Sequence, residues 1–169
     1  MTTRCLVLVR HAKAAQGGAA DTARPLTAGG TTDAAGIGAW LSRLPLVPDR
    51  VVVSPARRAG ETWERAAACL PATPEPITDE RIYLNTVDAL LSVIHDTPDD
   101  VQTLVLVGHN PAMAQLANSL ADKHGDAAAM VELAHGYPAS GVAVFVTSTP
   151  WRQVRAGTAT LTHFAAPPV

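Results

Sequence analysis

The stretch Arg4-Cys5-Leu6-Val7-Leu8-Val9-Arg10-His11 decides the fold class of this chain. Five consecutive apolar residues lie between its two arginines, and no polar residue alternates with them. Such a run is typical of a strand that is buried on both faces of a sheet, because a strand with one wet face would alternate apolar and polar residues. A second run of this kind spans Thr103–Val107, and a third comprises Val51–Val53. Buried strands of this type predict a mainly parallel sheet with helices on both faces.

Helical patterns separate these strands along the chain. We expect four helices, bounded roughly by residues 28–43, 55–70, 87–96 and 111–123. Ser54 and Asn110 are expected to cap the second and fourth helices, each followed by a proline in the first helical position. Two closing strands are expected at Val142–Val146 and Thr158–Phe164. The predicted fold is therefore an α/β three-layer sandwich, with a mainly parallel sheet in one domain over residues 1–169.

Composition excludes several classes of protein. Of 169 residues, 13 are basic (eleven of them arginine) and 15 are acidic, so the net charge is -2. A nucleic-acid-binding domain would carry a basic excess, so we expect no nucleic-acid partner. No apolar stretch reaches the ~18 residues of a membrane span, and the first apolar run is too short for a signal peptide. We therefore expect a cytoplasmic protein without membrane contact.

The cysteines and histidines do not indicate a metal site. Cys5 and Cys69 have neither metal-binding spacing nor the pattern of a disulfide framework, and we interpret them as reduced packing residues. No two histidines follow the HxH or HxxxH spacing of zinc ligands. We expect no metal and no cofactor.

Three strand ends carry polar side chains of similar kinds. The first strand ends in Arg10-His11, the second runs into Ser54-Pro55-Ala56-Arg57-Arg58, and the third ends in Gly108-His109-Asn110. In open parallel sheets, ligands bind outside the carboxyl ends of the strands. Helix N-termini at the same edge and forked guanidinium groups both favour a phosphate-like anion. The sequence therefore predicts an anion site that contains two histidines and several arginines.

These motifs resemble those of the histidine phosphatase superfamily, the phosphoglycerate-mutase-like enzymes. The resemblance rests on Leu8-Val9-Arg10-His11-Ala12, on Ser54-Pro55-x-x-Arg58-Ala59-x-x-Thr62 and on Leu106-Val107-Gly108-His109-Asn110-Pro111. A fourth segment, Arg24-Pro25-Leu26-Thr27-x-x-Gly30, is similar to one found in the SixA-like phosphohistidine phosphatases. That subgroup has about this length and lacks the large cap insertion of bigger relatives.

The resemblance implies roles for four residues. His11 would be the nucleophile that becomes a phosphohistidine, which requires a neutral imidazole whose tautomer is fixed by an acceptor. Arg10 and Arg58 would clamp the phosphoryl oxygens, and His109 would donate to the same oxygens. Thr62 lies one helical turn after Arg58, where it could orient the guanidinium.

Other candidate residues have two interpretations each. Arg24 either pairs with Asp21 at the surface or contacts the phosphate, and Asn110 is a candidate for phosphate or substrate binding as well as a helix cap. Arg57 is interpreted as a solvated residue, with a role at the pocket rim as the alternative. Glu80 is the natural candidate for a general acid; the alternative is a solvated loop carboxylate.

The resemblance implies a metal-independent phosphatase, with a phosphohistidine-bearing protein as the first substrate candidate. A small phosphate ester is the second candidate, and a non-catalytic module that binds a phosphorylated ligand is the alternative of a different class. The intact set of Arg10, His11, Arg58 and His109 disfavours this last alternative. The sequence leaves the oligomeric state open.

Overall fold

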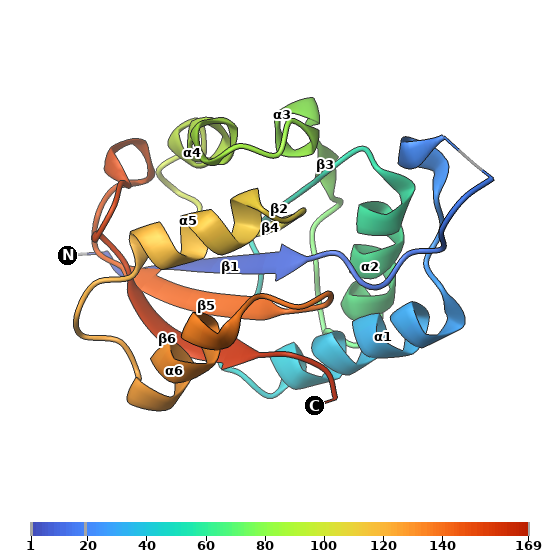
Figure 1. The fold of residues 1–169 in the computed structure, drawn as a ribbon. Helices are drawn as coiled ribbons and strands as arrows, with labels where there is room; N and C mark the ends of the chain where they lie inside the picture. The colour runs from blue at the N-terminus through green and yellow to red at the C-terminus, as the bar shows by residue number, and fades with distance from the viewer. Residues whose placement is uncertain (1, 19, 169) are drawn as a thin grey trace.

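A six-stranded sheet forms the centre of the molecule, in the computed structural model that describes residues 2–18 and 20–168 (Figure 1). The strand order is β3-β2-β4-β1-β5-β6. The strands are β1 (Arg4–Arg10), β2 (Arg50–Val53), β3 (Ile77–Thr78), β4 (Thr103–Gly108), β5 (Val142–Thr147) and β6 (Thr160–Ala165). The first four are mutually parallel, whereas β5 runs antiparallel to both β1 and β6. The predicted α/β fold with its closing strands is confirmed.

The register of the parallel strands brings their carboxyl ends together. Arg10, the last residue of β1, lies opposite Gly108, the last residue of β4. Val53, the last residue of β2, lies opposite Val107. The residues that follow these three strands therefore emerge side by side at one edge of the sheet, as the sequence predicts.

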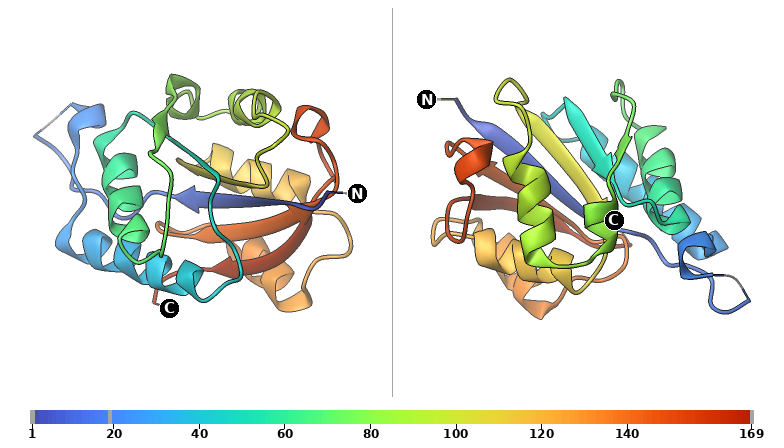
Figure 2. Two further views of the ribbon diagram at one scale, coloured as in Figure 1. Left: turned by 180° about the vertical axis from the view of Figure 1, so that it is seen from behind. Right: turned by 90° about the horizontal axis from the view of Figure 1, so that it is seen from above.

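Apolar side chains fill both faces of the sheet. Leu6 and Leu8 pack with residues of α3 (Glu80–Tyr83), α4 (Val87–His95), α5 (Ala112–Leu120) and α6 (Ala127–His135). Val7 and Val9 point to the opposite face and pack with α1 (Ala28–Ser42) and α2 (Arg57–Ala67). Figure 2 shows these two groups of helices on either side of the sheet. Because β1 is buried on both faces, it carries a continuous apolar run.

Of the four expected helix starts, those at residues 28 and 87 are correct, and those at residues 55 and 111 are wrong. Thr27 caps α1, and its hydroxyl accepts a hydrogen bond from the Gly30 amide. Ser54 does not cap α2, which begins at Arg57 after Ala56 with no side-chain cap. The Ser54 hydroxyl instead accepts from the Ala56 amide, ahead of the helix, and contacts His109.

The start of α5 also differs from the expectation, because the helix begins at Ala112 rather than at Pro111. The Ala112 amide donates to Asn85 Oδ1 at 3.1 Å, so a side chain from another loop satisfies the free helix end. Asn110 still contributes, since its Oδ1 accepts from the Ala114 amide at 3.2 Å.

Two helices were not expected from the sequence. They are the short α3 and the nine-residue α6, which precedes β5. In the described part of the chain, no helix is long and apolar enough to cross a membrane.

Candidate active site

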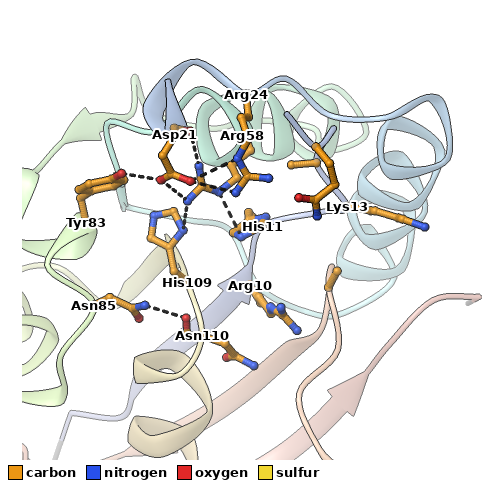
Figure 3. A pocket seen from close by; sticks show the side chains of 13 residues that line it. Arg10, His11, Lys13, Asp21, Arg24, Arg58, Tyr83, Asn85, His109 and Asn110 are labelled. Carbon is orange, nitrogen blue, oxygen red and sulfur yellow. Dashed lines mark hydrogen bonds and ion pairs between the residues drawn. The ribbon is translucent and has the colours of Figure 1, made fainter. Parts of the chain in front are cut away.

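A cavity of about 510 Å³ lies at the carboxyl ends of β1, β2 and β4 (Figure 3). It is lined by Arg10, His11, Lys13, Ala14, Gln16, Asp21, Arg24, Arg58, Tyr83, Asn85, His109, Asn110 and Ala139. The lining contains four cationic side chains and one carboxylate, Asp21. A chain with a net charge of -2 therefore concentrates positive charge in this cavity.

His11 is held as a neutral imidazole with a defined tautomer. Its Nδ1 lies 2.7 Å from the carbonyl oxygen of Ala12, which can only accept, so Nδ1 carries the proton. The other nitrogen, Nε2, accepts a hydrogen bond from Arg58 Nε at 3.3 Å. Burial and, to a lesser extent, the positive charge of Arg58 together lower the pKa of His11 to about 4. At neutral pH Nε2 is consequently unprotonated, and its lone pair accepts the Arg58 hydrogen bond.

Arg58 lies in the first turn of α2 and is almost completely buried, with 6% of its surface exposed. Besides His11, its guanidinium contacts Asp21 through two donors. Nη1 donates to the Asp21 carbonyl at 2.8 Å, and Nη2 donates to the Asp21 carboxylate at 3.1 Å. Nη2 also lies 3.4 Å from Nδ1 of His109. One guanidinium thus joins both histidines of the site.

Thr62 does not orient the Arg58 guanidinium, so that expectation is wrong. Its hydroxyl donates to the Arg58 backbone carbonyl at 2.7 Å and accepts from the Ala12 amide at 2.9 Å. The helix geometry places Thr62 one turn after Arg58, but its side chain faces the loop that follows β1. It therefore fixes the backbone beside His11 to α2.

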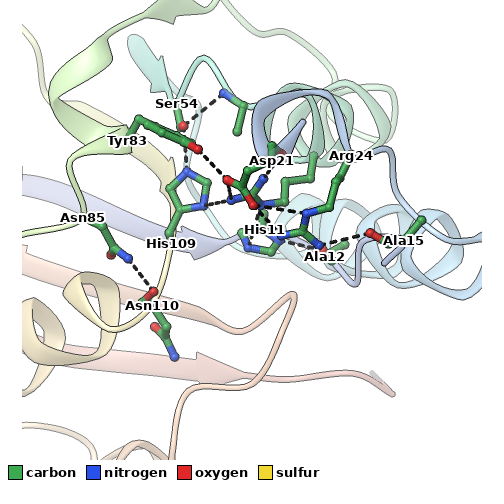
Figure 4. Close-up of polar contacts among 12 residues, drawn as sticks. His11, Ala12, Ala15, Asp21, Arg24, Ser54, Tyr83, Asn85, His109 and Asn110 are labelled. Atoms are coloured by element: carbon green, nitrogen blue, oxygen red, sulfur yellow. Dashed lines mark hydrogen bonds and ion pairs between the residues drawn. The ribbon is translucent and has the colours of Figure 1, made fainter. Parts of the chain in front are cut away.

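His109 follows β4 and contacts Ser54 at the end of β2 (Figure 4). Its Nε2 lies 2.7 Å from Ser54 Oγ, which also accepts from the Ala56 amide at 3.2 Å. Since Arg58 can only donate, Nδ1 of His109 accepts, and Nε2 carries the proton toward Ser54. Burial lowers the pKa of His109 to about 3, with the charges of His11 and Arg58 as further causes.

Arg10 and Asn110 share one acceptor at the opposite wall of the cavity. Arg10 Nη1 and Asn110 Nδ2 donate to the carbonyl oxygen of Tyr137, at 2.8 and 2.9 Å respectively. Tyr137 itself is buried, and its hydroxyl donates to the Leu8 carbonyl. The Nε of Arg10 is buried and has no hydrogen-bond partner among the described residues.

Arg24 pairs with Asp21, as the first of its two interpretations predicts, and its contact with phosphate stays a prediction. It pairs with the Asp21 carboxylate, with Nε at 3.2 Å and Nη2 at 3.1 Å, and it also lines the cavity. Its Nη1 donates to the Ala15 carbonyl at 3.1 Å. The hydroxyl of Tyr83 donates to the same Asp21 carboxylate at 2.5 Å.

Glu80 and Arg57 are not among the residues that line this cavity. Glu80 is exposed in the first turn of α3, three residues before the cavity residue Tyr83. Arg57 forms an ion pair with Glu61 at 2.7 Å on the exposed face of α2. Asp21 is therefore the carboxylate that lies in the cavity.

The sequence analysis does not identify several residues that line this site, among them Lys13, Asp21, Tyr83 and Asn85. Asp21 was considered only as a surface partner of Arg24. Asn85 has a left-handed backbone (φ 61°), which asparagine tolerates, and its Nδ2 donates to the Asn110 carbonyl at 2.7 Å. No spacing rule connects these loops to the strand ends, because their contacts depend on how α3 packs.

The cavity residues do not form a cluster suited to a metal ion. Within residues 2–18 and 20–168, no group of three or more histidine, cysteine, aspartate or glutamate side chains could hold one.

Comparisons with known proteins agree with this geometry. The family model of the histidine phosphatase superfamily (branch 1) matches residues 6–83. An uncharacterized protein of Mycobacterium tuberculosis is 37% identical over 162 residues, which cover 94% of this chain and 99% of that protein. The phosphohistidine phosphatase SixA of Escherichia coli is 30% identical over 117 residues, covering 67% of this chain and 71% of SixA.

A solved structure extends the likeness over the whole chain. The protein assigned as phosphohistidine phosphatase SixA from Nakamurella multipartitia superposes with a TM-score of 0.87 at 29% identity, covering 100% of this chain and 99% of that one. The motifs of the sequence, the fold and the relatives thus agree. The chain therefore belongs to the histidine phosphatase superfamily and, within it, to the SixA-like phosphatases.

Proposed function

We propose that this protein hydrolyses a phosphoryl group through a covalent phosphohistidine at His11. The observation that carries the proposal is the state of His11, which is neutral and presents the Nε2 lone pair to a cavity lined by four cations. A neutral imidazole is a nucleophile, whereas an imidazolium is not. The surrounding cations supply charge stabilisation, which is most of what phosphoryl transfer asks of a protein.

The reaction would proceed in two displacements. In the first, the Nε2 lone pair of His11 forms a bond to phosphorus, and the bond to the leaving group breaks with its electron pair going to that group. In the second, water attacks the phosphohistidine, inorganic phosphate leaves, and His11 regains its lone pair. Splitting one difficult step into two is the general advantage of a covalent intermediate.

The other cavity residues have proposed roles because each carries N–H groups that could donate to phosphoryl oxygens. Arg10, whose Nε is buried without a partner, and Arg58 would bind the phosphoryl oxygens. Arg24 and Asn110 line the same cavity and would add donors there. His109 accepts from Arg58 in the free protein. It would donate from Nδ1 to a phosphoryl oxygen in the other tautomer, in which Nε2 has given up its proton, Nδ1 has gained one, and the Ser54 hydroxyl donates to Nε2.

A phosphohistidine in a protein is the proposed substrate. Imidazole departs more readily than an alkoxide and needs less help from a general acid. Glu80 does not line the cavity, and hydrogen bonds from Tyr83 and the arginines hold the pKa of Asp21 well below its usual range. The absence of a protonated carboxyl group among the described cavity residues favours this leaving group over an ester oxygen. The names of the SixA relatives support the same choice.

We propose one catalytic domain without a large cap, which would leave the cavity open to a protein side chain, and a cytoplasmic location. A small phosphate ester is the alternative substrate. A module that only binds phosphorylated ligands is the alternative without catalysis.

One experiment tests the chemistry and the substrate together. The wild-type protein, His11→Ala and the surface control His124→Ala are each offered a phosphohistidine protein and a panel of phosphate esters, and phosphate release is measured. We expect wild type and control to prefer the phosphohistidine protein and His11→Ala to be inactive. Activity of His11→Ala would exclude the covalent route, and a strong preference for one ester would exclude the proposed substrate. Binding without turnover by the wild type would favour the non-catalytic module.

Metal dependence is tested separately by exhaustive treatment with EDTA. We expect full phosphatase activity to remain, because the proposed steps use only protein groups. Loss of activity that added divalent metal restores would contradict the proposal.

A further inference from the structure

The carboxylate of Asp21 occupies the donors that a phosphoryl group would need. It accepts from Arg58 Nη2 at 3.1 Å and from Arg24 Nε and Nη2 at 3.2 and 3.1 Å. Tyr83 adds a hydroxyl donor to the same carboxylate. Arginine uses the same N–H donors to bind the oxygens of a carboxylate and the oxygens of a phosphate. Figure 3 shows Asp21 between Tyr83 and the two arginines.

The donors of Arg58 are almost fully used in this arrangement. A guanidinium has five N–H groups. Those of Arg58 have four acceptors, which are His11 Nε2, the Asp21 carbonyl, the Asp21 carboxylate and His109 Nδ1. Arg58 Nε is thereby directed at the lone pair that His11 would use for attack. A phosphoryl group that takes two donors of Arg58, as in a forked contact, must displace at least one of these partners.

The exposure of these side chains indicates which partner of Arg58 an incoming phosphoryl group would displace. The Asp21 side chain is 52% exposed, whereas the Arg58 side chain is 7% exposed. A carboxylate at this surface can exchange its protein donors for water at low cost, while a buried guanidinium without a partner is expensive. The two histidines that contact Arg58 are also mostly buried. Asp21 is therefore the partner that an incoming phosphoryl group replaces.

We propose that Asp21 is a further functional residue of the pocket, which competes with the phosphoryl group for Arg58 and so limits how tightly the pocket holds inorganic phosphate. In the free protein the carboxylate stands where phosphoryl oxygens would bind. After hydrolysis it returns to Arg58 and promotes release of phosphate. This inference rests on the proposed phosphatase function and deepens it, because it assigns a residue to product release.

The charges in the cavity support a competing role over a purely positioning one. Hydrogen bonds from Tyr83, Arg24 and Arg58 lower the pKa of Asp21, so it is ionised throughout the neutral range. An ionised carboxylate within reach of the phosphate site repels a phosphate dianion, because like charges in partly shielded surroundings oppose each other. A residue that only positioned Arg58 would instead help the pocket to bind phosphate.

The test measures binding of inorganic phosphate to the full chain by titration calorimetry. The variants are Asp21→Asn and Asp21→Ala, and the matched control is Asp99→Asn. Asp99 pairs with Arg152 at 2.9 Å and is 62% exposed, but it does not line the cavity. We expect the two Asp21 variants to bind phosphate about three- to tenfold tighter than wild type, as the loss of partly exposed ion pairs suggests. We expect the control to bind as wild type does.

Steady-state kinetics provides the second measurement. Product inhibition by phosphate should strengthen in both Asp21 variants by the same factor as binding. Unchanged or weaker phosphate binding in both variants, with wild-type binding intact, would overturn the competing role and leave the phosphatase proposal standing. Failure of the wild type itself to bind phosphate would contradict the proposed function and this inference with it.

Discussion

Replacement of Thr62 by valine removes two hydrogen bonds with almost no change in shape. The Thr62 hydroxyl connects the Arg58 carbonyl in α2 to the Ala12 amide beside His11, and both Thr62 and Ala12 are 0% exposed. In the valine variant the Arg58 carbonyl keeps its helical partner, but the Ala12 amide is buried without an acceptor. Such a group costs about 1–3 kcal/mol.

Burial of the added methyl group offsets about 0.8 kcal/mol of that cost. The expected net loss in the free energy of unfolding is therefore about 0.2–2.2 kcal/mol, which corresponds to a fall in Tm of at most about 9 °C for a chain of this length. Because the lost bond adjoins His11, we also expect kcat/KM to fall at least tenfold, as the nucleophile would no longer be held accurately against Arg58.

The assay compares Thr62→Val with Thr62→Ser, which keeps the hydroxyl and loses only a methyl group. Urea denaturation gives the free energy of unfolding, and phosphate release from a chromogenic phosphate ester gives kcat/KM. We expect the serine variant to retain most of the activity even if it loses some stability. The reasoning is refuted if the valine variant is as active as wild type, or if both variants lose activity equally.

Further predictions concern protonation and packing. Titration of the imidazole signals by NMR should show His11 and His109 neutral at pH 6, since burial lowers their pKa values to about 4 and about 3. The unfolded chain binds protons at these histidines below about pH 6.5 while the folded chain does not, so the free energy of unfolding should fall as pH decreases from about 6.5 toward 4. Equal stability at pH 7 and pH 5 would contradict these shifts. Gly30→Ala should destabilise the protein by about 1–3 kcal/mol, because its Cβ would lie 2.2 Å from a backbone carbonyl oxygen; Gly60→Ala, where nothing lies within 4 Å, should not destabilise it. Ser54→Ala should lower kcat more than it raises KM, because it frees the ring of His109 without removing a cation from the cavity; a change in KM alone would argue against this role.

The sequence determined the fold class and the edge of the sheet at which the site lies. Continuous apolar runs indicate strands that are buried on both faces, and the residues after such strands must meet at one edge when the strands are parallel. The sequence alone therefore places Arg10, His11 and His109 at this edge, where they line the cavity. The helix starts at Ser54 and Asn110 were predicted less well, because local capping preferences compete with partners from distant segments.

Tertiary structure decided which side chains contact one another. Asp21 and Arg58 are 37 residues apart in sequence, and Arg10 and the Tyr137 carbonyl are 127 apart. Periodicity reports which face of an element is buried, but the partner of a hydrogen bond depends on how whole elements pack. For this reason the sequence predicts a cluster of arginines that binds an anion. Only the packed structure shows that the Asp21 carboxylate accepts hydrogen bonds from two of these arginines in the free protein.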